Sequence, residues 1–299
     1  MFRSWTEADF KAIVEICNLH DKAVDPLFDG TSDDEVRDEL NGFYDEVFAE
    51  VFEVEGKITD LVTAQLDKKR KRAEIDVFGH PDNHHYDQSL SHAISWVKNN
   101  YPGFEIRGSC NQNDAELIAA NERAGLMVVR KYWTMVNRKP QSHYPALPTG
   151  VAIRKADFET ERTTWHSLLM ASFRDHYGYA QKSFADWDEQ QRKMSLQDED
   201  GVFFLEVEGE PVGLLVCTNH RAELNGGFID KLGVLSSHRG KGYGELLLRW
   251  GCAYSAQKGF TQVSLGVDST NQTGAVDLYL KAGFEPQNVW LAFSDSETL

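Results

Sequence analysis

The chain has 299 residues, with 31 Lys and Arg against 47 Asp and Glu, which gives a formal net charge of -16 at pH 7. This length exceeds what one hydrophobic core usually serves, so we expect two domains. The acid excess opposes binding to nucleic acid or to an anionic membrane, and neither a membrane-spanning run nor the apolar region of a signal peptide is present in the sequence. We therefore expect a cytoplasmic monomer or homodimer.

The cysteines and histidines do not predict a disulfide framework or a metal site. No C-x-x-C pair occurs, so buried free thiols are expected at Cys17, Cys110, Cys217 and Cys252. His84 and His85 are adjacent and point apart in extended backbone, and no third ligand has a readable spacing, so a solvated loop is expected there. The basic run at Lys68 to Arg72 is interpreted as a charged turn.

An internal repeat organises the chain. The segment VFEVEGKITDLV (Val51 to Val62) resembles FLEVEGEPVGLLV (Phe204 to Val216), and two shorter echoes follow in the same order at similar offsets. The repeat has a period of about 150 residues. A proline-containing stretch without periodicity separates the two copies. We predict a first domain at 1–140, a linker at 141–150 and a second domain at 151–299.

Strands and helices alternate in the second copy. The expected elements, in chain order, are a strand at Val151–Arg154, a helix carrying Trp165, Leu168, Leu169 and Phe173, a helix around Phe184–Met194, a hairpin, a strand at Gly227–Val234, a helix with Leu246, Leu247 and Trp250, a strand at Gln262–Val267, a helix at Thr273–Ala282 and terminal strands about Val289–Phe293. This order predicts an α+β fold built on a mixed, mostly antiparallel sheet flanked by helices.

The stretch SSHRGKGYGELLLRW (Ser236 to Trp250) has three glycines at the entrance of a helix. It is not a P-loop, because Lys241 is followed by Gly242 and not by Ser or Thr. It is not a dinucleotide fingerprint, because Glu245 stands where a glycine is needed. What remains is R-x-x-G-x-G before a helix, where backbone N–H groups and the helix dipole would hold a pyrophosphate.

This glycine loop, together with Asn271 and the segment LYLKAGF (Leu278 to Phe284), resembles the acetyl-CoA-binding core of the GNAT superfamily of N-acetyltransferases. The repeat implies that the first half has the same fold. Two such units in tandem, with the segment FRDHYGYAQKSFADW (Phe173 to Trp187), resemble the mycothiol synthase branch. The resemblance implies acetyl transfer from acetyl-CoA to a primary amine of a small molecule or peptide, without a metal.

The resemblance also implies site residues. A backbone N–H near Val234 would meet the thioester carbonyl, and the residues expected to bind acetyl-CoA are Leu232, Gly233, Val234, Arg239, Gly240, Lys241, Gly242, Tyr243, Gly244 and Asn271. Tyr279 matches the tyrosine that protonates the departing thiolate. Asp175, His176 and Tyr177 would line the acceptor pocket, where relatives have Trp in place of Tyr177.

The general base is less certain from the sequence. Phe228 stands where relatives often have Glu on the strand before the glycine loop. Asp230 lies two residues further on the same strand face and is the first candidate, and Glu223 is another. The absent Glu leaves open a non-catalytic acyl-CoA sensor or a tandem scaffold.

The first copy lacks the glycine loop. After its strand at Glu74 to Phe78 the sequence reads GHPDNHHYDQSL, with Gly79 as the single glycine and with Asp82 and Asp87 where a pyrophosphate would lie. Acidic side chains at that place oppose an anion. We therefore expect one acetyl-CoA site per chain, in the second copy.

Overall fold

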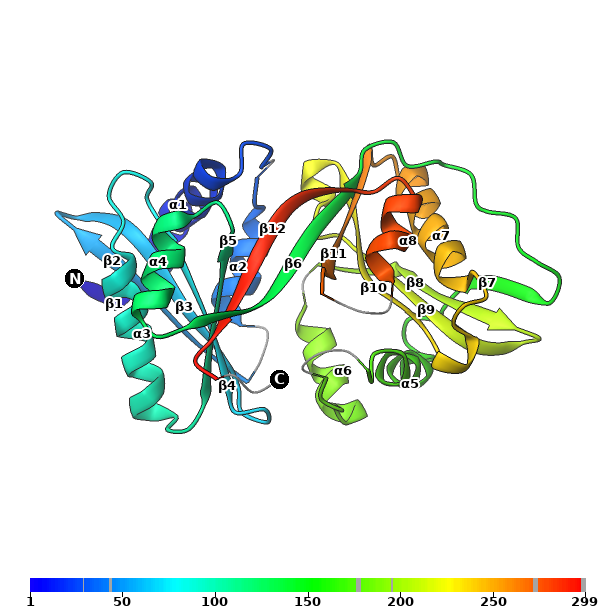
Figure 1. The fold of residues 1–299 in the computed structure, drawn as a ribbon, viewed down its shortest axis with the longest axis horizontal. Coiled ribbons are helices and arrows are strands. Elements are labelled where there is room, and N and C mark those ends of the chain that lie inside the picture. Colours follow the sequence, from blue (N-terminus) through cyan, green and yellow to red (C-terminus); the bar gives the residue numbers. More distant parts are fainter. Residues whose placement is uncertain (29, 43–44, 176–178, 195, 271–273, 297–299) are drawn as a thin grey trace. The chain divides into compact units, whose positions relative to one another are not determined.

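The computed structural model describes residues 1–28, 30–42, 45–175, 179–194, 196–270 and 274–296. The chain forms two compact units. Unit 1 consists of Met1–Tyr132 together with Asn288–Thr298, and unit 2 of Trp133–Gln287. Each unit contains one layer of sheet with helices on both faces (Figure 1).

Unit 1 is built on strands in the order β1-β2-β3-β4-β5-β12. Its elements are β1 (Phe2–Ser4), η1 (Glu7–Asp9), α1 (Phe10–Val24), α2 (Asp33–Asn41), β2 (Glu46–Val54), β3 (Lys57–Asp67), β4 (Arg72–Gly79), α3 (Tyr86–Asn100), β5 (Glu105–Asn111), α4 (Ala115–Arg123), the first part of β6 (Met127–Asn137) and most of β12 (Glu285–Ser294). β4 and β5 are parallel, whereas the pairs β1–β2, β2–β3, β3–β4 and β5–β12 are antiparallel.

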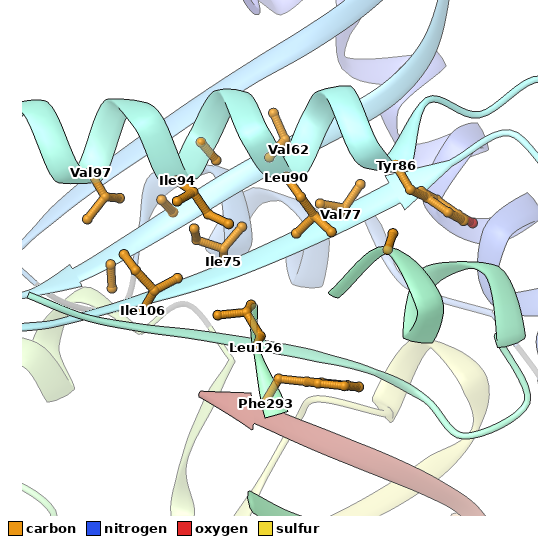
Figure 2. Close-up of a cluster of buried hydrophobic side chains, with 14 of the residues drawn as sticks. Val62, Ile75, Val77, Tyr86, Leu90, Ile94, Val97, Ile106, Leu126 and Phe293 are labelled. Carbon is orange, nitrogen blue, oxygen red and sulfur yellow. The ribbon is translucent and has the colours of Figure 1, made fainter. Parts of the chain in front are cut away.

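Alternation along β3 produces two hydrophobic cores in unit 1. Val62, Ala64 and Leu66 point to the face that α3 and α4 cover. Leu61 points to the other face, where it packs with residues of α1 and α2. Figure 2 shows the first of these cores, with Phe293 of β12 close to Leu126 on the side away from α3.

Unit 2 is built on strands in the order β6-β11-β10-β9-β8-β7. Its elements are β7 (Val151–Lys155), α5 (Arg162–Ser172), α6 (Phe184–Lys193), β8 (Gln197–Val207), β9 (Glu210–Thr218), η2 (Ala222–Leu224), β10 (Gly226–Val234), η3 (Ser236–His238), α7 (Tyr243–Gln257), β11 (Gln262–Asp268) and α8 (Ala275–Lys281). One core, which includes Leu247, Leu248 and Tyr279, lies between the sheet and α7 and α8. The other, with Trp165 and Trp187, lies under α5 and α6.

The two halves of the sequence repeat one order of elements. Each runs strand, helix, helix, hairpin, strand, helix, strand, helix, strand, which confirms the tandem α+β fold predicted from the repeat. The strands predicted at Glu74–Phe78, Gly227–Val234 and Gln262–Val267 are present with small changes of bounds. The predicted terminal strands are the single strand β12.

The compact units differ from the expected domains at the last strand of each half. Residues Trp133–Gln287 form unit 2, so the end of β6 belongs there, and Met135 lies in its core. Conversely, Asn288–Thr298 belongs to unit 1, where Leu291 and Phe293 of β12 are buried. The expected segments 1–140 and 151–299 therefore differ from the compact units, because the two terminal strands are exchanged.

Smaller expectations can also be compared with the structure. All four cysteines are free and buried, as predicted. The basic run from Lys68 forms the turn between β3 and β4. Within the described residues, no helix combines the length and the apolar character needed to cross a membrane.

Candidate functional site

A β-bulge interrupts β10 in the middle of unit 2. Ile229 pairs with Cys217 of β9 and Lys231 pairs with the next residue, Val216, so Asp230 is the extra residue. Ile229 and Leu232 both pack against the core under α7. Asp230 and Lys231 therefore share the opposite face, and their side chains form an ion pair at 2.6 Å between Oδ1 and Nζ.

β10 separates from β11 at the same place. The parallel pairing runs from Gly226–Gln262 to Ile229–Leu265 and ends there, although β10 continues to Val234. The N–H of Leu235 donates to Val212 O of β9 at 2.9 Å. Because successive N–H groups point to opposite edges of a strand, the N–H of Val234 points to the open edge. The role that the resemblance implies for this group, donation to a thioester carbonyl, stays a prediction.

The loop before α7 presents a row of backbone donors. Gly240 (φ +76°) and Gly242 (φ +81°) adopt the left-handed conformation, which explains both glycines. A Cβ at either position would meet no heavy atom within 4 Å, so the space beside the loop is open. In the described part of the chain, no acceptor is found for the N–H groups of Gly240 to Gly244, and no side chain caps α7. These five donors at a helix N-terminus fit a pyrophosphate group.

Gly244 and Gly233 serve packing. A Cβ on Gly244 would lie 3.3 Å from Leu278 Cδ2, so its absence allows α7 and α8 to approach closely. A Cβ on Gly233 would lie 2.7 Å from Ser172 Cβ, so α5 can rest directly on β10. Both glycines therefore hold helices beside the separated strands.

The side chain of Arg239 binds protein groups. Its Nε donates to Val234 O (3.1 Å), its Nη2 to Ser172 O (2.7 Å) and its Nη1 to Asp175 Oδ2 (3.1 Å). The guanidinium thus joins the end of α5 to the end of β10. Its expected role in binding acetyl-CoA stays a prediction, and its observed contacts give it a positioning role.

Tyr279 lies on the inner face of α8, with 9% of its surface exposed. Its ring belongs to the core under α7 and α8 and lies 6.1 Å from the ring of Phe284. Burial raises the pKa of the phenol to about 12, so the hydroxyl stays protonated at neutral pH. Among the described residues its hydroxyl has no hydrogen-bond partner, which leaves the proton available to a substrate.

The sequence did not single out two ionisable side chains near Asp230. Lys231 forms the ion pair with Asp230 and would orient its carboxylate. His220 follows β9, its Nδ1 lies 2.8 Å from Thr218 Oγ1, and its ring lies 5.5 Å from that of Phe228. An imidazole beside Phe228 has no local sequence signal, because the bend after β9 brings it there. The alternative base, Glu223, lies in η2 before β10 begins.

Three expected site residues cannot be placed. Asn271, His176 and Tyr177 lie outside the described residues. Asp175 is described, and it is more than half exposed and bonded to Arg239.

The equivalent strand of unit 1 lacks the bulge. β4 pairs with β3 without a register shift from Arg72 to Gly79. Its parallel pairing with β5 nevertheless ends at Ile75–Gly108, as that of β10 with β11 ends at Ile229–Leu265. Asp76 and Asp230 are therefore topological equivalents, each the residue after the last parallel pair.

In the loop after β4, backbone N–H groups donate hydrogen bonds to acceptors of unit 1. The N–H of Gly79 donates to His20 Nδ1 (3.3 Å), that of His80 to Thr59 O (2.7 Å) and that of His85 to Asp60 Oδ1 (2.7 Å). A Cβ on Gly79 would lie 2.5 Å from His84 Cβ, so the loop folds back onto the strand. These contacts occupy three N–H groups of the loop itself, whereas no side chain caps α3, which begins after it.

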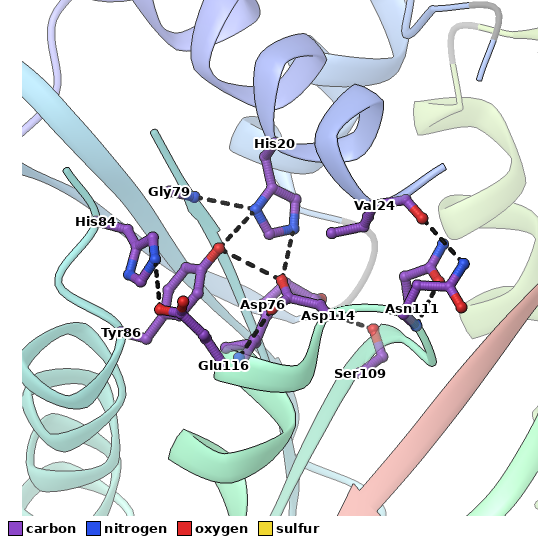
Figure 3. A network of polar contacts seen from close by, with 12 residues as sticks. His20, Val24, Asp76, Gly79, His84, Tyr86, Ser109, Asn111, Asp114 and Glu116 are labelled. Atoms are coloured by element: carbon purple, nitrogen blue, oxygen red, sulfur yellow. Dashed lines mark hydrogen bonds and ion pairs between the residues drawn. The ribbon is translucent and has the colours of Figure 1, made fainter. Parts of the chain in front are cut away.

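A polar network fills the region beside this loop (Figure 3). Tyr86 Oη lies 3.1 Å from His20 Nδ1 and donates to Asp114 Oδ2 at 3.3 Å. His20 is buried, and burial lowers the pKa of its imidazole, which is therefore neutral at pH 7. The network fixes the N-termini of α3 and α4, since Asp114 also caps α4.

His84 and His85 belong to the surroundings of this network. His84 Nε2 lies 2.9 Å from Glu116 Oε2, and His85 Nδ1 lies 3.2 Å from Asp60 Oδ2. Both residues lie in the loop before α3, with about a fifth of each side chain exposed (21% and 23%), and the two rings bind different partners, as their expected divergence implies.

Unit 1 also buries two carboxyl groups near β4. Glu39 Oε1 accepts from Thr63 Oγ1 at 2.6 Å, and Asp76 Oδ1 accepts from Ser109 Oγ at 2.7 Å. Burial raises the pKa of Glu39 to about 7 and also raises that of Asp76. Asp76 and Asp230 are both half-buried, but Asp76 accepts a hydrogen bond from a hydroxyl whereas Asp230 is paired with a cation.

Comparisons with known proteins agree with this geometry. Residues 162–284 match the sequence model of the Acetyltransferase (GNAT) family. An uncharacterised N-acetyltransferase of Methanocaldococcus jannaschii is 33% identical over 129 residues, which are 39% of this chain and 54% of that protein, so the match spans about half of the relative's length.

Solved structures cover nearly the whole chain. A GCN5-related N-acetyltransferase from Sphaerobacter thermophilus has a TM-score of 0.80 at 19% identity and covers 98% of this chain and 94% of its own. A tandem GNAT protein from the clavulanic acid biosynthesis pathway, solved without AcCoA, has a TM-score of 0.78 at 13% identity over 100% of this chain and 99% of its own. The chain therefore has the GNAT fold in tandem, and its second half matches the acetyltransferase (GNAT) family.

Proposed function

We propose that this protein is an N-acetyltransferase that transfers an acetyl group from acetyl-CoA to a primary amine of a small molecule or peptide. The observation that carries the proposal is the row of N–H groups from Gly240 to Gly244, which have no acceptor among the described residues, beside a strand whose own edge is open from Asp230 to Val234. A pyrophosphate needs the first feature and an extended pantetheine amide chain the second.

Backbone groups would bind and polarise the donor. The N–H groups of the loop and the dipole of α7 would hold the pyrophosphate, and the N–H of Val234 would donate to the thioester carbonyl oxygen, where negative charge develops. Arg239 keeps α5 and β10 together at that place through Val234 O and Ser172 O. The bound donor supplies the activated acetyl group.

Two side chains would move the protons. The attacking amine must lose a proton, which Asp230 would accept directly or through a water molecule, and the leaving sulfur must gain one, which the hydroxyl of Tyr279 would donate. Lys231, whose Nζ lies 2.6 Å from Asp230 Oδ1, would orient the carboxylate. Asp175, at the exposed end of the Arg239 bridge, would lie near the entering acceptor.

The same reasoning predicts no acetyl-CoA site in unit 1. Its loop donors bind His20, Thr59 and Asp60, and its β4 has no bulge. We expect one acetyl-CoA per chain. The likeness to the mycothiol synthase branch stays a prediction, and it does not identify the acceptor.

The test has two parts on the full chain. Calorimetry with acetyl-CoA should give one site, and a panel of amine acceptors should give thiol release that depends on both acetyl-CoA and an amine. Two equivalent sites would contradict the reading of unit 1.

A non-catalytic acyl-CoA sensor is the second candidate, because Phe228 stands where relatives often have Glu and because the carboxylate of Asp230 is engaged in an ion pair with Lys231. The sensor predicts binding without turnover on any amine, and turnover on one amine would exclude it.

A further inference from the structure

Unit 2 contains a pocket outside the region proposed for acetyl-CoA, with a volume of about 330 Å³. It is lined by Asn137, Lys139, Gln141, His143, Pro145, Arg249, Cys252, Ala282 and Gly283. All nine belong to unit 2. The volume lies at the small end of ligand pockets.

The outer wall of this pocket is the segment after β6, and it is held in place. The ring of Tyr144 lies 4.1 Å from that of Trp250, and Gln257 Nε2 donates to Ser142 O at 2.9 Å. At the other end, Asn137 Nδ2 donates to Ala282 O at 3.2 Å. The segment expected to be a simple linker is therefore fixed on α7 and the end of α8.

The lining is cationic in a strongly acidic protein. Lys139, His143 and Arg249 can carry positive charge, and no Asp or Glu is among the nine residues. Burial raises the pKa of the Cys252 thiol to about 12, so it adds no negative charge. Arg249 Nε binds Glu245 Oε1 at 2.8 Å, but over the described ranges its two terminal nitrogens, Lys139 Nζ and the His143 ring have no partner.

The pocket is separate from the glycine loop. Arg249 and Cys252 lie seven and ten residues after Gly242, which corresponds to about 10 to 15 Å along α7. None of the lining residues belongs to the loop or to the open edge of β10. A ligand held there would leave the proposed acetyl-CoA site accessible.

We propose that this pocket binds a compact organic or inorganic anion with at least two negative charges, such as a small polycarboxylate or a phosphate group. Two cationic groups, Lys139 and Arg249, and the imidazole of His143 surround a small volume, and this lining favours concentrated negative charge. The terminal nitrogens of Arg249 and the carboxamide of Gln141 add hydrogen bonds that a monovalent ion such as chloride uses poorly.

The experiment measures binding of citrate and of inorganic phosphate to the full chain by calorimetry, at constant ionic strength and with saturating CoA. We expect one saturable site for at least one of them. Lys139→Gln, which leaves α7 unchanged, should weaken binding several-fold, and the double variant with Arg249→Gln about tenfold or more.

Arg138→Gln is the matched control. Arg138 is adjacent to Lys139, pairs with Glu285 and does not line the pocket, so its loss removes the same charge with less than a twofold effect. The proposal is overturned if neither anion binds, if the double variant binds as the parent does, or if the control loses as much affinity as Lys139→Gln. Competition with CoA would assign the anion to the glycine loop and would equally overturn it. Because no turnover is needed, a failure here is independent of the proposed acetyltransferase activity.

Discussion

Strands β4 and β10 occupy the same place in two copies of one fold and differ in what surrounds them. Each has an Ile followed by an Asp where its parallel neighbour leaves it. β10 carries a bulge at Asp230 and is followed by a loop with free donors, whereas β4 is regular and its loop is internally bonded. The fold alone therefore does not account for the proposed cofactor site. Within the described residues, β10 and its loop differ from β4 and its loop by one extra residue and by a row of N–H groups without an acceptor.

The two copies differ in the same way at α8 and α4. Tyr279 stands four residues before Gly283, and Asn121 stands four before Gly125. Asn121 is fully buried, and its Nδ2 donates to Leu117 O at 2.9 Å. A carboxamide cannot protonate a leaving thiolate, so unit 1 lacks this group as well.

The largest expected effect comes from making unit 2 resemble unit 1 at this position. Tyr279→Phe keeps the ring and removes the proton donor, so single-turnover acetyl transfer should fall about 100-fold while acetyl-CoA affinity changes little. Because the pKa of Tyr279 is about 12, the parent should show no loss of rate from its ionisation up to about pH 10. A transfer rate within about twofold of the parent would mean that another group or water serves the sulfur.

An acidic side chain in the glycine loop of unit 2 should weaken acetyl-CoA binding, as we expect for the acidic loop of unit 1. Gly242→Asp, which corresponds in character to Asp82 of unit 1, should weaken acetyl-CoA binding by about 2 kcal/mol, or about 30-fold, through repulsion and blocked access.

Two variants separate the causes. Gly242→Ala imposes backbone strain at φ +81° without charge and should cost less, about 1 kcal/mol. His80→Asp, in the loop of unit 1, should leave affinity unchanged. Equal losses in the Asp and Ala variants of Gly242 would assign the effect to strain alone.

A smaller effect is expected at the bulge. Asp230→Asn should lower kcat/KM about tenfold and alter the acid limb of its pH profile, if Asp230 accepts the amine proton. Asp76→Asn in unit 1 is the control and should leave the profile unchanged. An unchanged profile for Asp230→Asn would transfer the role to another group, such as Glu223 or His220, whose ring lies 5.5 Å from that of Phe228.

The smallest effect concerns stability and belongs to unit 1. The pKa of Glu39 is raised to about 7, so its protonated form favours the folded state, and this contribution is complete below about pH 4.5 and is lost as the pH rises through 7. Glu39→Gln should therefore increase stability by about 1 kcal/mol at pH 8 and change it little at pH 4.5.

Thermal unfolding at the two pH values measures this difference. The exposed Glu122→Gln on α4 is the control and should be insensitive to pH. A Glu39→Gln variant that is equally destabilised at both values would mean that the Thr63 hydrogen bond outweighs the buried charge.

Local patterns predicted much of this molecule. The repeat, the elements of the second half and the glycines at 240 and 242 were readable because periodicity and positive φ leave direct marks in a sequence. Tyr279 was found because its motif surrounds it within one short helix.

Tertiary contacts decided the rest. The partners of Arg239 are a distant carbonyl and carboxylate, so its positioning role could not be inferred from R-x-x-G-x-G alone. The bulge at Asp230 depends on the register with β9, and the buried Glu39 depends on how α2 crosses the sheet. The cationic pocket forms only because the segment after β6 folds back over α7.

Because the terminal strands are exchanged, neither half of the sequence contains a complete compact unit. A fragment of residues 151–299 would carry β12 without the sheet that Leu291 and Phe293 complete, and would lose Met135 from its own core. We therefore expect that cutting the segment between the copies would not yield two halves that each contain a complete unit.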